Sequence, residues 1–450
     1  MKLVMRKKNV ILKKNEILDK IEQEECLQLF NFANTSSWVF IKDYLYWVLV
    51  CREYSQRRYS FRTHLNYRGI YLFILSFINF VCSFLRFKDS LLYIGAGSRI
   101  LKTCDNEFHD IYLPKAEKDR IIYFISGDSS VNKLYERRKY IRKNRIVITS
   151  LLLTPLRNII KCLLVPFYYG KRKDFWKFCI ALNKYDLQID YVSLMYYHLK
   201  FVAGYYLYKG ILNIFKFKKA YVVCAYEKAD LVAACIAKNI IVTEIQHGII
   251  GKLHRGYNYK CPSEIKLPTP DYVVVSNLFW KNELIDAGYY KNEQVLLDEA
   301  SDENCIRSID ELRSERYVVF TSQNIINNQI VDFLKEANDF LSKRRILLYY
   351  LPHPTELEVD LDRLQSFLKH CTNIKVVLNK QFTTNEYIYH SLAHISLFST
   401  CHFDSFFLKG KTFILNILSE NVYEYYVEKY PDNFLLIKRI EDILLYTDLI

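Results

Sequence analysis

The chain has 450 residues, of which 51% are hydrophobic and 25% are charged, and its formal net charge is +14 at pH 7. The hydrophobic fraction excludes a disordered chain, and the length favours two domains over a single core. The basic residues are spread out, without zinc-finger spacing, an RNA-binding segment or a basic zipper, so we expect no nucleic-acid partner. The twelve cysteines stand singly, which indicates reduced thiols in a cytoplasmic protein and no metal site.

Residues 1–87 are predicted to be mainly helical, because apolar residues recur at helical spacing between Glu16 and Phe32. A long apolar run follows from Ile70 to Leu85, and a second extends from Leu151 to Tyr169. A spanning helix needs about 20 apolar residues, whereas the first run is shorter and prolines and basic residues interrupt the second. Each run therefore predicts either a buried core helix or a helix that lies on a lipid surface.

Basic residues flank the second apolar run, with Arg137-Arg138-Lys139 before it and Lys171-Arg172-Lys173 after it. An anionic cytoplasmic membrane surface attracts such clusters, although ordinary solvated helix faces have the same composition. We therefore predict a cytoplasmic protein, and the functional interpretation of these clusters is a peripheral contact with the anionic inner face of the plasma membrane.

The first α/β domain is predicted at residues 88–300. Strands are expected at 90–94, 120–126, 145–149, 220–225, 240–245 and 271–275. A helix at 231–238 connects two of them, and the order strand, helix, strand implies parallel pairing. After the first strand, Gly95-Ala-Gly97 is similar to a phosphate-binding turn, but close packing of a strand on a helix favours the same residues.

A charged stretch at 298–316 is predicted to separate this domain from a second α/β domain at residues 301–450. Strands are expected at 317–320, 346–350, 374–378, 394–398 and 412–415, and the last of these is expected to close the sheet. Helices are expected at 329–343, 385–392 and 403–408. The sequence therefore predicts two Rossmann-like α/β domains whose sheet edges face a shared cleft, preceded by a helical region.

Polar groups are dense where the strand at 240–245 ends. Glu244 is followed by Gln246-His247-Gly248, and His254 lies in the next loop. Alternation along a strand breaks at its terminal turn, and Gly248 is expected to supply a backbone conformation that other residues avoid. Glu244 or His247 can act as a general base if it reaches a substrate hydroxyl. These side chains are predicted to share one cleft, although a single buried histidine more often has a structural role.

Three strand ends of the second domain carry polar turns, namely Thr321-Ser322-Gln323, His353-Pro354 and Ser399-Thr400. The first and third join hydroxyl groups to the unpaired N–H groups of an expected helix start, which is a geometry that binds anions. Pro354 favours an extended conformation for His353, so this imidazole is expected to project from the strand end. Ordinary helix capping is the alternative explanation for each turn.

The pair His353-Pro354 with the later Ser399-Thr400 resembles the bacterial sialyltransferase, polysialyltransferase and Kdo-transferase group, which are GT-B glycosyltransferases that use CMP-activated acidic sugars. This resemblance implies that His353 and Pro354 contact the CMP part of a donor and that Ser399 and Thr400 lie near its phosphate. Gln246-His247-Gly248 and His254-Arg-Gly-Tyr257 are similar to bacterial surface-polysaccharide proteins, which implies substrate contacts there too. The group's acidic residue followed by glycine is absent from this chain, so His247 or Glu244 takes the role of the base.

These features predict a metal-independent, inverting glycosyltransferase without a cofactor. The donor is a nucleotide sugar, with a CMP-sugar favoured, and the acceptor is a glycan or lipid-linked glycan of capsule or lipopolysaccharide synthesis. Asp360-Leu-Asp362 is interpreted as the solvated start of a helix and not as a metal motif. The alternatives are a CDP-polyol phosphotransferase or a sugar-nucleotide epimerase on the same fold, and a non-catalytic, membrane-associated scaffold of a polysaccharide assembly complex.

Overall fold

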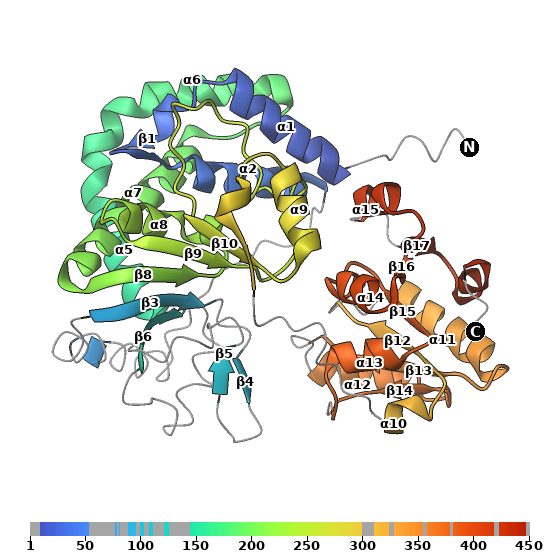
Figure 1. Ribbon diagram of the computed structural model, residues 1–450. Coiled ribbons are helices and arrows are strands. Elements are labelled where there is room, and N and C mark those ends of the chain that lie inside the picture. Colours follow the sequence, from blue (N-terminus) through green and yellow to red (C-terminus); the bar gives the residue numbers. More distant parts are fainter. Residues whose placement is uncertain are drawn as a thin grey trace. The chain divides into compact units, whose positions relative to one another are not determined.

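The computed structural model (Figure 1) divides the chain into two compact units. The first unit spans Leu12–Ser301, and the second includes Asp302–Ile450. The structure describes residues 10–53, 77–78, 81, 89–95, 100–102, 108–110, 121–125, 145–298, 310–323, 328–353, 358–378, 381–417 and 423–446.

The first unit contains a seven-stranded sheet in the order β11-β10-β9-β8-β3-β6-β7, and all of its neighbouring strands are parallel. Its strands are β3 (Asp89–Gly95), β6 (Ile121–Ile125), β7 (Arg145–Thr149), β8 (Lys216–Val222), β9 (Ile241–Ile245), β10 (Tyr272–Val275) and β11 (Val295–Leu297). The chain starts at β3, builds outward to β7, and then returns to the other side of β3 and builds outward to β11. This is the doubly wound arrangement, in which ligands bind beyond the carboxyl ends of the strands near the switch point, here between β3 and β8.

Helices accompany the strands of the first unit. They are α1 (Val10–Glu24), α2 (Trp38–Glu53), α5 (Ser150–Tyr168), α6 (Arg172–Leu182), α7 (Tyr191–Ile214), α8 (Ala229–Ile236) and α9 (Leu278–Asp286). Short 3₁₀ helices lie at Leu27–Phe30, Tyr169–Lys171, Asn183–Tyr185, Ala225–Lys228 and Asn292–Gln294. The remaining strands form two small antiparallel pairs, β1 (Asn31–Phe32) with β2 (Thr35–Ser36) and β4 (Ile100–Lys102) with β5 (Phe108–Asp110).

The described N-terminal residues are helical, as predicted, and they share a core with later helices of the same unit. Phe30 and Trp38 are buried together with Phe175 and Phe178 of α6, and the ring centroids of Phe30 and Phe178 are 5.0 Å apart. The predicted apolar helix at 70–85 lies almost entirely outside the described residues. No helix in the described part of the chain combines the length and the apolar character needed to cross a membrane.

The second unit has a six-stranded parallel sheet in the order β14-β13-β12-β15-β16-β17, which is again doubly wound, with its switch point between β12 and β15. Its strands are β12 (Tyr317–Thr321), β13 (Leu347–Leu351), β14 (Ile374–Val376), β15 (Ala393–Ser396), β16 (Thr412–Leu415) and β17 (Phe434–Ile437). Its helices are α10 (Asp310–Arg313), α11 (Asn328–Ser342), α12 (Glu358–Phe367), α13 (Thr384–His390), α14 (Cys401–Lys409), α15 (Glu424–Lys429) and a 3₁₀ helix at Ile440–Leu445.

The predicted pair of Rossmann-like α/β sheets is therefore confirmed, and each expected strand has a counterpart within a few residues. One detail was wrong: the strand at Thr412–Leu415 does not close its sheet, because Phe434–Ile437 pairs with it and forms the edge. The shared cleft concerns the placement of one unit against the other, and it stays a prediction.

Candidate functional site

Glu244 is the buried centre of the candidate site in the first unit. It lies on β9, one residue before the strand ends, and only 1% of it is exposed. Its Oε1 accepts two hydrogen bonds, one from the Tyr257 hydroxyl at 2.6 Å and one from the Ala225 backbone N–H at 3.0 Å. Ala225 follows β8, and Tyr257 comes from the loop after β9. One carboxylate oxygen therefore joins two segments that lie at the carboxyl edge of the sheet.

Burial raises the pKa of the Glu244 carboxyl to about 7, although the bonds from Tyr257 and Ala225 favour the charged form and oppose this rise. A carboxyl group with this pKa exchanges its proton near neutral pH, as groups in catalytic centres often do. Glu244 is nevertheless sealed from solvent. Direct contact between Glu244 and a substrate would require Tyr257 to move.

His254 lies in the loop after β9 and is held between two aromatic rings. Its ring centroid is 5.0 Å from that of Tyr226 and 4.9 Å from that of Tyr257. Its Nδ1 accepts the backbone N–H of Gly256 at 3.1 Å. Burial lowers the pKa of His254 well below its ordinary value, and the nearby Arg255 and His247 lower it further. The imidazole is therefore neutral, and its Nε2 carries the proton because Nδ1 is an acceptor.

His247 is half-buried and lies next to a cysteine at the end of β8. The Cys224 Sγ is 3.1 Å from His247 Nε2. Cys224 has φ 57°, in the left-handed region that non-glycine residues seldom adopt. Burial raises the pKa of the Cys224 thiol to about 12, so the thiol stays protonated. In the tautomer that carries its proton on Nε2, the imidazole donates to Sγ and keeps Nδ1 as its acceptor. Of the two residues predicted to be catalytic, His247 is the one that reaches the surface.

Gln246 and Gly248 have structural roles in this turn. The Gln246 Oε1 accepts the Ser276 backbone N–H at 3.0 Å, and its Nε2 donates to the Gly248 carbonyl at 2.9 Å. Gln246 therefore ties the end of β9 to the end of β10. The expectation for Gly248 was wrong: its φ is not in the left-handed region, and a Cβ there would meet nothing within 4 Å.

In the loop after β9, two glycines have a structural requirement, Gly251 and Gly256. Gly251 has φ 106°, which disfavours other residues. A Cβ on Gly256 would lie 2.5 Å from the Tyr226 ring. The loop backbone therefore approaches this ring more closely than any residue with a side chain would allow, and this approach brings His254 and Tyr257 beside it.

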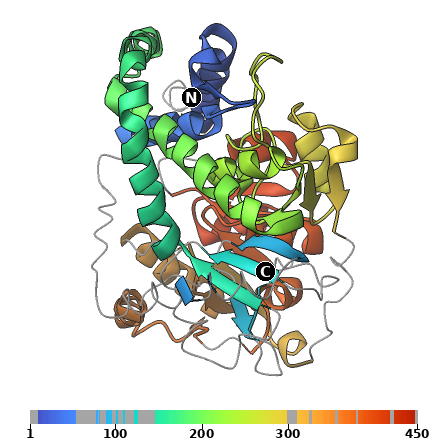
Figure 2. The same cartoon turned by 90° about the vertical axis from the view of Figure 1, so that its left-hand side faces the viewer.

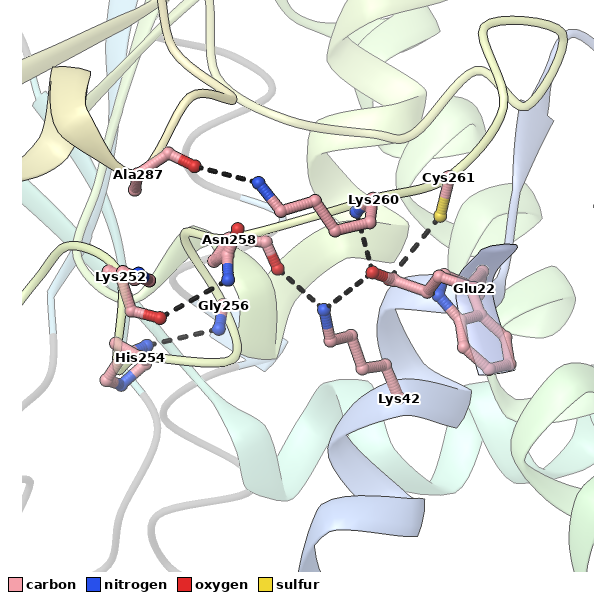
Figure 3. Close-up of polar contacts among 10 residues, drawn as sticks. Glu22, Lys42, Lys252, His254, Gly256, Asn258, Lys260, Cys261 and Ala287 are labelled. Carbon is pink, nitrogen blue, oxygen red and sulfur yellow. Dashed lines mark hydrogen bonds and ion pairs between the residues drawn. The ribbon is translucent and has the colours of Figure 1, made fainter. Parts of the chain in front are cut away.

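Two residues of the N-terminal helices clamp this loop, as Figure 3 shows. Glu22 of α1 pairs with Lys42 of α2 at 3.0 Å, and both side chains are buried. The Lys42 ammonium also donates to the Asn258 carbonyl at 2.6 Å, while the Glu22 Oε2 accepts the backbone N–H of Lys260 at 2.7 Å. The indole N–H of Trp38 donates to the Glu22 Oε1 at 2.7 Å. The pair is thus fully hydrogen-bonded, and it fixes the loop that carries His254 and Tyr257.

A second link between this loop and α2 involves Arg255. Its Nε forms an ion pair with the Asp43 carboxylate, and its guanidinium lies 4.3 Å from the centre of the Tyr46 ring. No local sequence pattern indicates a role for Glu22, Lys42 or Asp43. Their roles depend on contacts more than 200 residues away in the chain.

In the second unit, the three predicted turns lie at one sheet edge. β12 pairs with β13 and with β15, so Thr321 is level with Leu351 and with Ser396. Ser322, His353 and Ser399 therefore follow three neighbouring parallel strands at their carboxyl ends. His353 is half-buried. Pro354 lies outside the described residues.

Thr321 is directed into the core of this unit and not toward the sheet edge. Its hydroxyl lies 2.9 Å from His394 Nε2, and His394 Nδ1 lies 3.0 Å from the Thr412 hydroxyl. Thr412 in turn contacts His402 Nδ1 at 2.7 Å. Burial lowers the pKa of both histidines, that of His402 to about 3, so this is a neutral network inside the unit. The geometry expected for Thr321, a hydroxyl aimed at an anion, is not the one observed.

The hydroxyls of Ser322 and Ser399 are also engaged within the protein. The Ser322 Oγ accepts the Tyr350 hydroxyl at 2.8 Å, and the Gln323 amide donates to the Ser322 carbonyl at 2.9 Å. The Ser399 Oγ accepts the Cys401 backbone N–H at 3.1 Å, which caps the start of α14 as expected of such a turn. Thr400 is exposed next to it. His353 and Gln323 are half-buried, so Thr400 is the most exposed of the predicted residues that the structure describes at this edge.

No protein-family model matches the chain, and no curated protein matches it. Several solved structures have a similar backbone fold. One is UDP-GlcNAc 2-epimerase from Neisseria meningitidis bound to UDP-GlcNAc, which is 10% identical to this chain with a TM-score of 0.41; the alignment covers 79% of this chain and 89% of that chain. UDP-GlcNAc 2-epimerase from Methanocaldococcus jannaschii has 12% identity and a TM-score of 0.41 over 79% of this chain and 90% of that one. A glycosyltransferase from Rickettsia africae has 11% identity and a TM-score of 0.38 over 80% and 86%. Similarities at this level do not bear on activity.

Proposed function

We propose that the protein is an enzyme that acts on a nucleotide sugar, and that it transfers the sugar to a glycan or lipid-linked glycan. The observation that carries this proposal is the half-buried His247 at the carboxyl edge of β9, which contacts Cys224, the residue before the Ala225 N–H that Glu244 holds. Doubly wound sheets bind their ligands at this edge. A neutral imidazole there can accept the proton of an acceptor hydroxyl.

In this proposal His247 is the base and Glu244 is a positioning residue. Glu244 holds the Ala225 N–H, and the neighbouring Cys224 contacts the His247 ring. As the acceptor hydroxyl loses its proton to His247, its oxygen forms a bond to the anomeric carbon, and the bond from that carbon to the nucleotide phosphate breaks. The configuration at the anomeric carbon inverts in this single displacement.

The donor nucleotide is assigned to the second unit, at the edge formed by Ser322, His353 and Ser399. This assignment rests on the parallel register of the three strands and on the resemblance of His353-Pro354 and Ser399-Thr400 to CMP-sugar enzymes. An imidazole hydrogen bond to a nucleotide phosphate is charge-assisted and contributes about 1.5–3 kcal/mol. The proposal also requires the two edges to face one cleft.

A thermal-shift panel tests this assignment of the donor nucleotide. The nucleotides are CMP, CDP, UDP and GDP, and the proteins are the wild type, His353→Ala and His370→Ala. A ligand that binds the folded protein raises its unfolding temperature. His370 is exposed at the end of α12 in the same unit, so its replacement controls for loss of an imidazole. We expect one nucleotide to stabilise the wild type and His370→Ala, and at least a tenfold weaker affinity for His353→Ala. If the wild type binds none of these nucleotides, the proposal is refuted and the alternative of a non-catalytic scaffold of a polysaccharide assembly complex is favoured.

A sugar-nucleotide epimerase is the second candidate. The carboxyl edge of β9 carries an imidazole, that of His247, and a carboxyl group whose pKa is about 7, that of Glu244, and an epimerase needs groups that remove and return a proton. The two functions differ in their need for an acceptor. Incubation of the wild type with the nucleotide sugar alone should leave a transferase substrate unchanged, whereas an epimerase would convert it.

A further inference from the structure

Helix α5 carries an exposed apolar stripe formed by Leu156, Ile159, Leu163 and Phe167. The spacing of three or four residues places these side chains on one face of the helix. Their exposed fractions are 41%, 58%, 67% and 81%, respectively. Large side chains exposed together in this way mark a surface that docks on another body.

The opposite face of α5 is packed against its own unit. Arg157 Nη1 forms an ion pair with the buried Asp230 of α8 at 3.1 Å, and the Lys161 ammonium lies 4.0 Å from the centre of the Tyr196 ring of α7. These contacts fix the rotation of α5 about its axis, so the stripe faces outward. In Figure 2, α5 stands upright along the outer side of the first unit.

A cationic segment follows the stripe directly. Lys171 ends the short 3₁₀ helix between α5 and α6, and Arg172 and Lys173 are the first two residues of α6; we call these three residues the basic corner. The Arg172 guanidinium lies 4.2 Å from the centre of the exposed Tyr169 ring. Trp176, one turn into α6, is also exposed. Apolar residues flanked by tyrosine, tryptophan and basic residues are typical of helices that lie at a membrane interface.

We propose that the apolar stripe and the basic corner dock the protein on an anionic phospholipid bilayer. Residues 150–173 contain five Lys or Arg and no Asp or Glu. Asp174, which is exposed in the first turn of α6, is the acidic side chain next to the basic corner. The same face of a second copy would therefore bring mainly positive charge to the basic corner, whereas anionic headgroups offer opposite charge across the whole face. The inference does not depend on the proposed function, because a scaffold could dock in the same way. It would bring an enzyme to a lipid-linked acceptor.

The experiment measures co-sedimentation of the whole chain with vesicles of phosphatidylcholine, alone or with about 30% phosphatidylserine. The variant Lys171→Gln/Arg172→Gln/Lys173→Gln removes the basic corner. Each cation near an anionic surface contributes about 1 kcal/mol, or about fivefold in partitioning. We therefore expect about a hundredfold weaker binding to the anionic vesicles. Lys343→Gln/Arg344→Gln/Arg345→Gln is the control, because it makes the same change of charge in the second unit.

The apolar stripe is tested with Leu163→Glu/Phe167→Glu, and with Phe167→Ser as a milder variant should the double variant fail to fold. Leu278→Glu changes an equally exposed leucine on α9 and serves as the control. We expect the double variant to bind anionic vesicles at least tenfold more weakly, with a smaller loss for Phe167→Ser and none for Leu278→Glu. Circular dichroism and the unfolding temperature verify the fold.

Three results would overturn the inference. The first is wild-type protein that stays in the supernatant with anionic vesicles, and the second is stripe variants that sediment like the wild type. The third is a wild-type dimer in solution that Leu163→Glu/Phe167→Glu converts to a monomer, because the stripe would then be an interface between copies of this chain.

Discussion

Replacement of Glu244 by glutamine tests the buried carboxyl through the pH dependence of stability. Both donors, Tyr257 and Ala225, address the same oxygen, Oε1. A glutamine with its carbonyl oxygen in that position keeps both hydrogen bonds and places its amide where Oε2 lies. Glu244→Gln therefore removes the ionisation and leaves the contacts at Oε1 in place.

The magnitude follows from the pKa of Glu244, which is about 7 in the folded protein and 4.5 ordinarily. Each pH unit between these values corresponds to about 1.4 kcal/mol, so ionising Glu244 in the folded protein costs about 3 kcal/mol. Because the folded state holds the proton more tightly, this cost is absent below pH 4.5. It grows as the pH rises, and it is fully present above pH 7.

The assay is urea denaturation of the wild type and of Glu244→Gln between pH 4 and pH 8, followed by tryptophan fluorescence. Trp38, Trp47, Trp176 and Trp280 are the four tryptophans of the chain, and all belong to the first unit, so the signal reports the unfolding of that unit. We expect Glu244→Gln and the wild type to differ little in this term at pH 4. At pH 8 the free energy of unfolding of Glu244→Gln, relative to that of the wild type, should be about 3 kcal/mol higher than at pH 4. A difference that stays constant with pH would refute the reasoning.

Four further replacements probe the packing around the site and the second unit. Lys42→Met leaves the buried Glu22 carboxylate without its cation and should lower the unfolding free energy by about 3 kcal/mol or more in urea denaturation. Gly256→Ala should cost about 1–3 kcal/mol in the same assay, because a Cβ there overlaps an aromatic ring, whereas Gly248→Ala should stay within about 0.5 kcal/mol. Thr321→Val should lower the melting temperature of the second unit, at a cost of about 1–2 kcal/mol, without changing nucleotide affinity.

Each of these expectations has an outcome that contradicts it. Equal stability of Lys42→Met and the wild type would mean that the ion pair does not hold the loop. A larger loss of unfolding free energy in Gly248→Ala than in Gly256→Ala would mean that Gly248 does need a backbone conformation that other residues avoid. If Thr321→Val folds normally but loses nucleotide binding, the Thr321 hydroxyl contacts the ligand, as the sequence predicted.

The fold could be predicted from the sequence because the strands are short apolar runs that end in polar turns. Tyr317–Thr321 is buried along its whole length, and its first four residues, Tyr-Val-Val-Phe, form an uninterrupted apolar run, as expected of a central parallel strand. In the two large sheets, the strands that were not predicted are β11 and β17, and both lie at sheet edges; the small pairs β1-β2 and β4-β5 were not predicted either. β11 has only three residues, of which two are exposed, so its pattern is too short to separate from a loop.

The site could be predicted only where its residues are neighbours in the sequence. Glu244, His254 and Tyr257 lie within fourteen residues, and the structure brings them into contact. Cys224 and Glu22 escaped prediction because nothing near them in the sequence indicates what they touch. Thr321 was misplaced because a hydroxyl at a strand end can point to either face, and buried partners such as His394 decide which face it takes.

The proposed role of His247 as the base is decided by the turnover of the nucleotide sugar in His247→Ala. The nucleotide identified by thermal shift, carrying its sugar, is incubated with a glycan acceptor, and the product is quantified for the wild type, His247→Ala and His370→Ala. General-base catalysis contributes about a hundredfold or more. The account predicts that His247→Ala lowers kcat by at least this factor while nucleotide affinity and His370→Ala activity stay at the wild-type level. Equal turnover by His247→Ala and the wild type would contradict it.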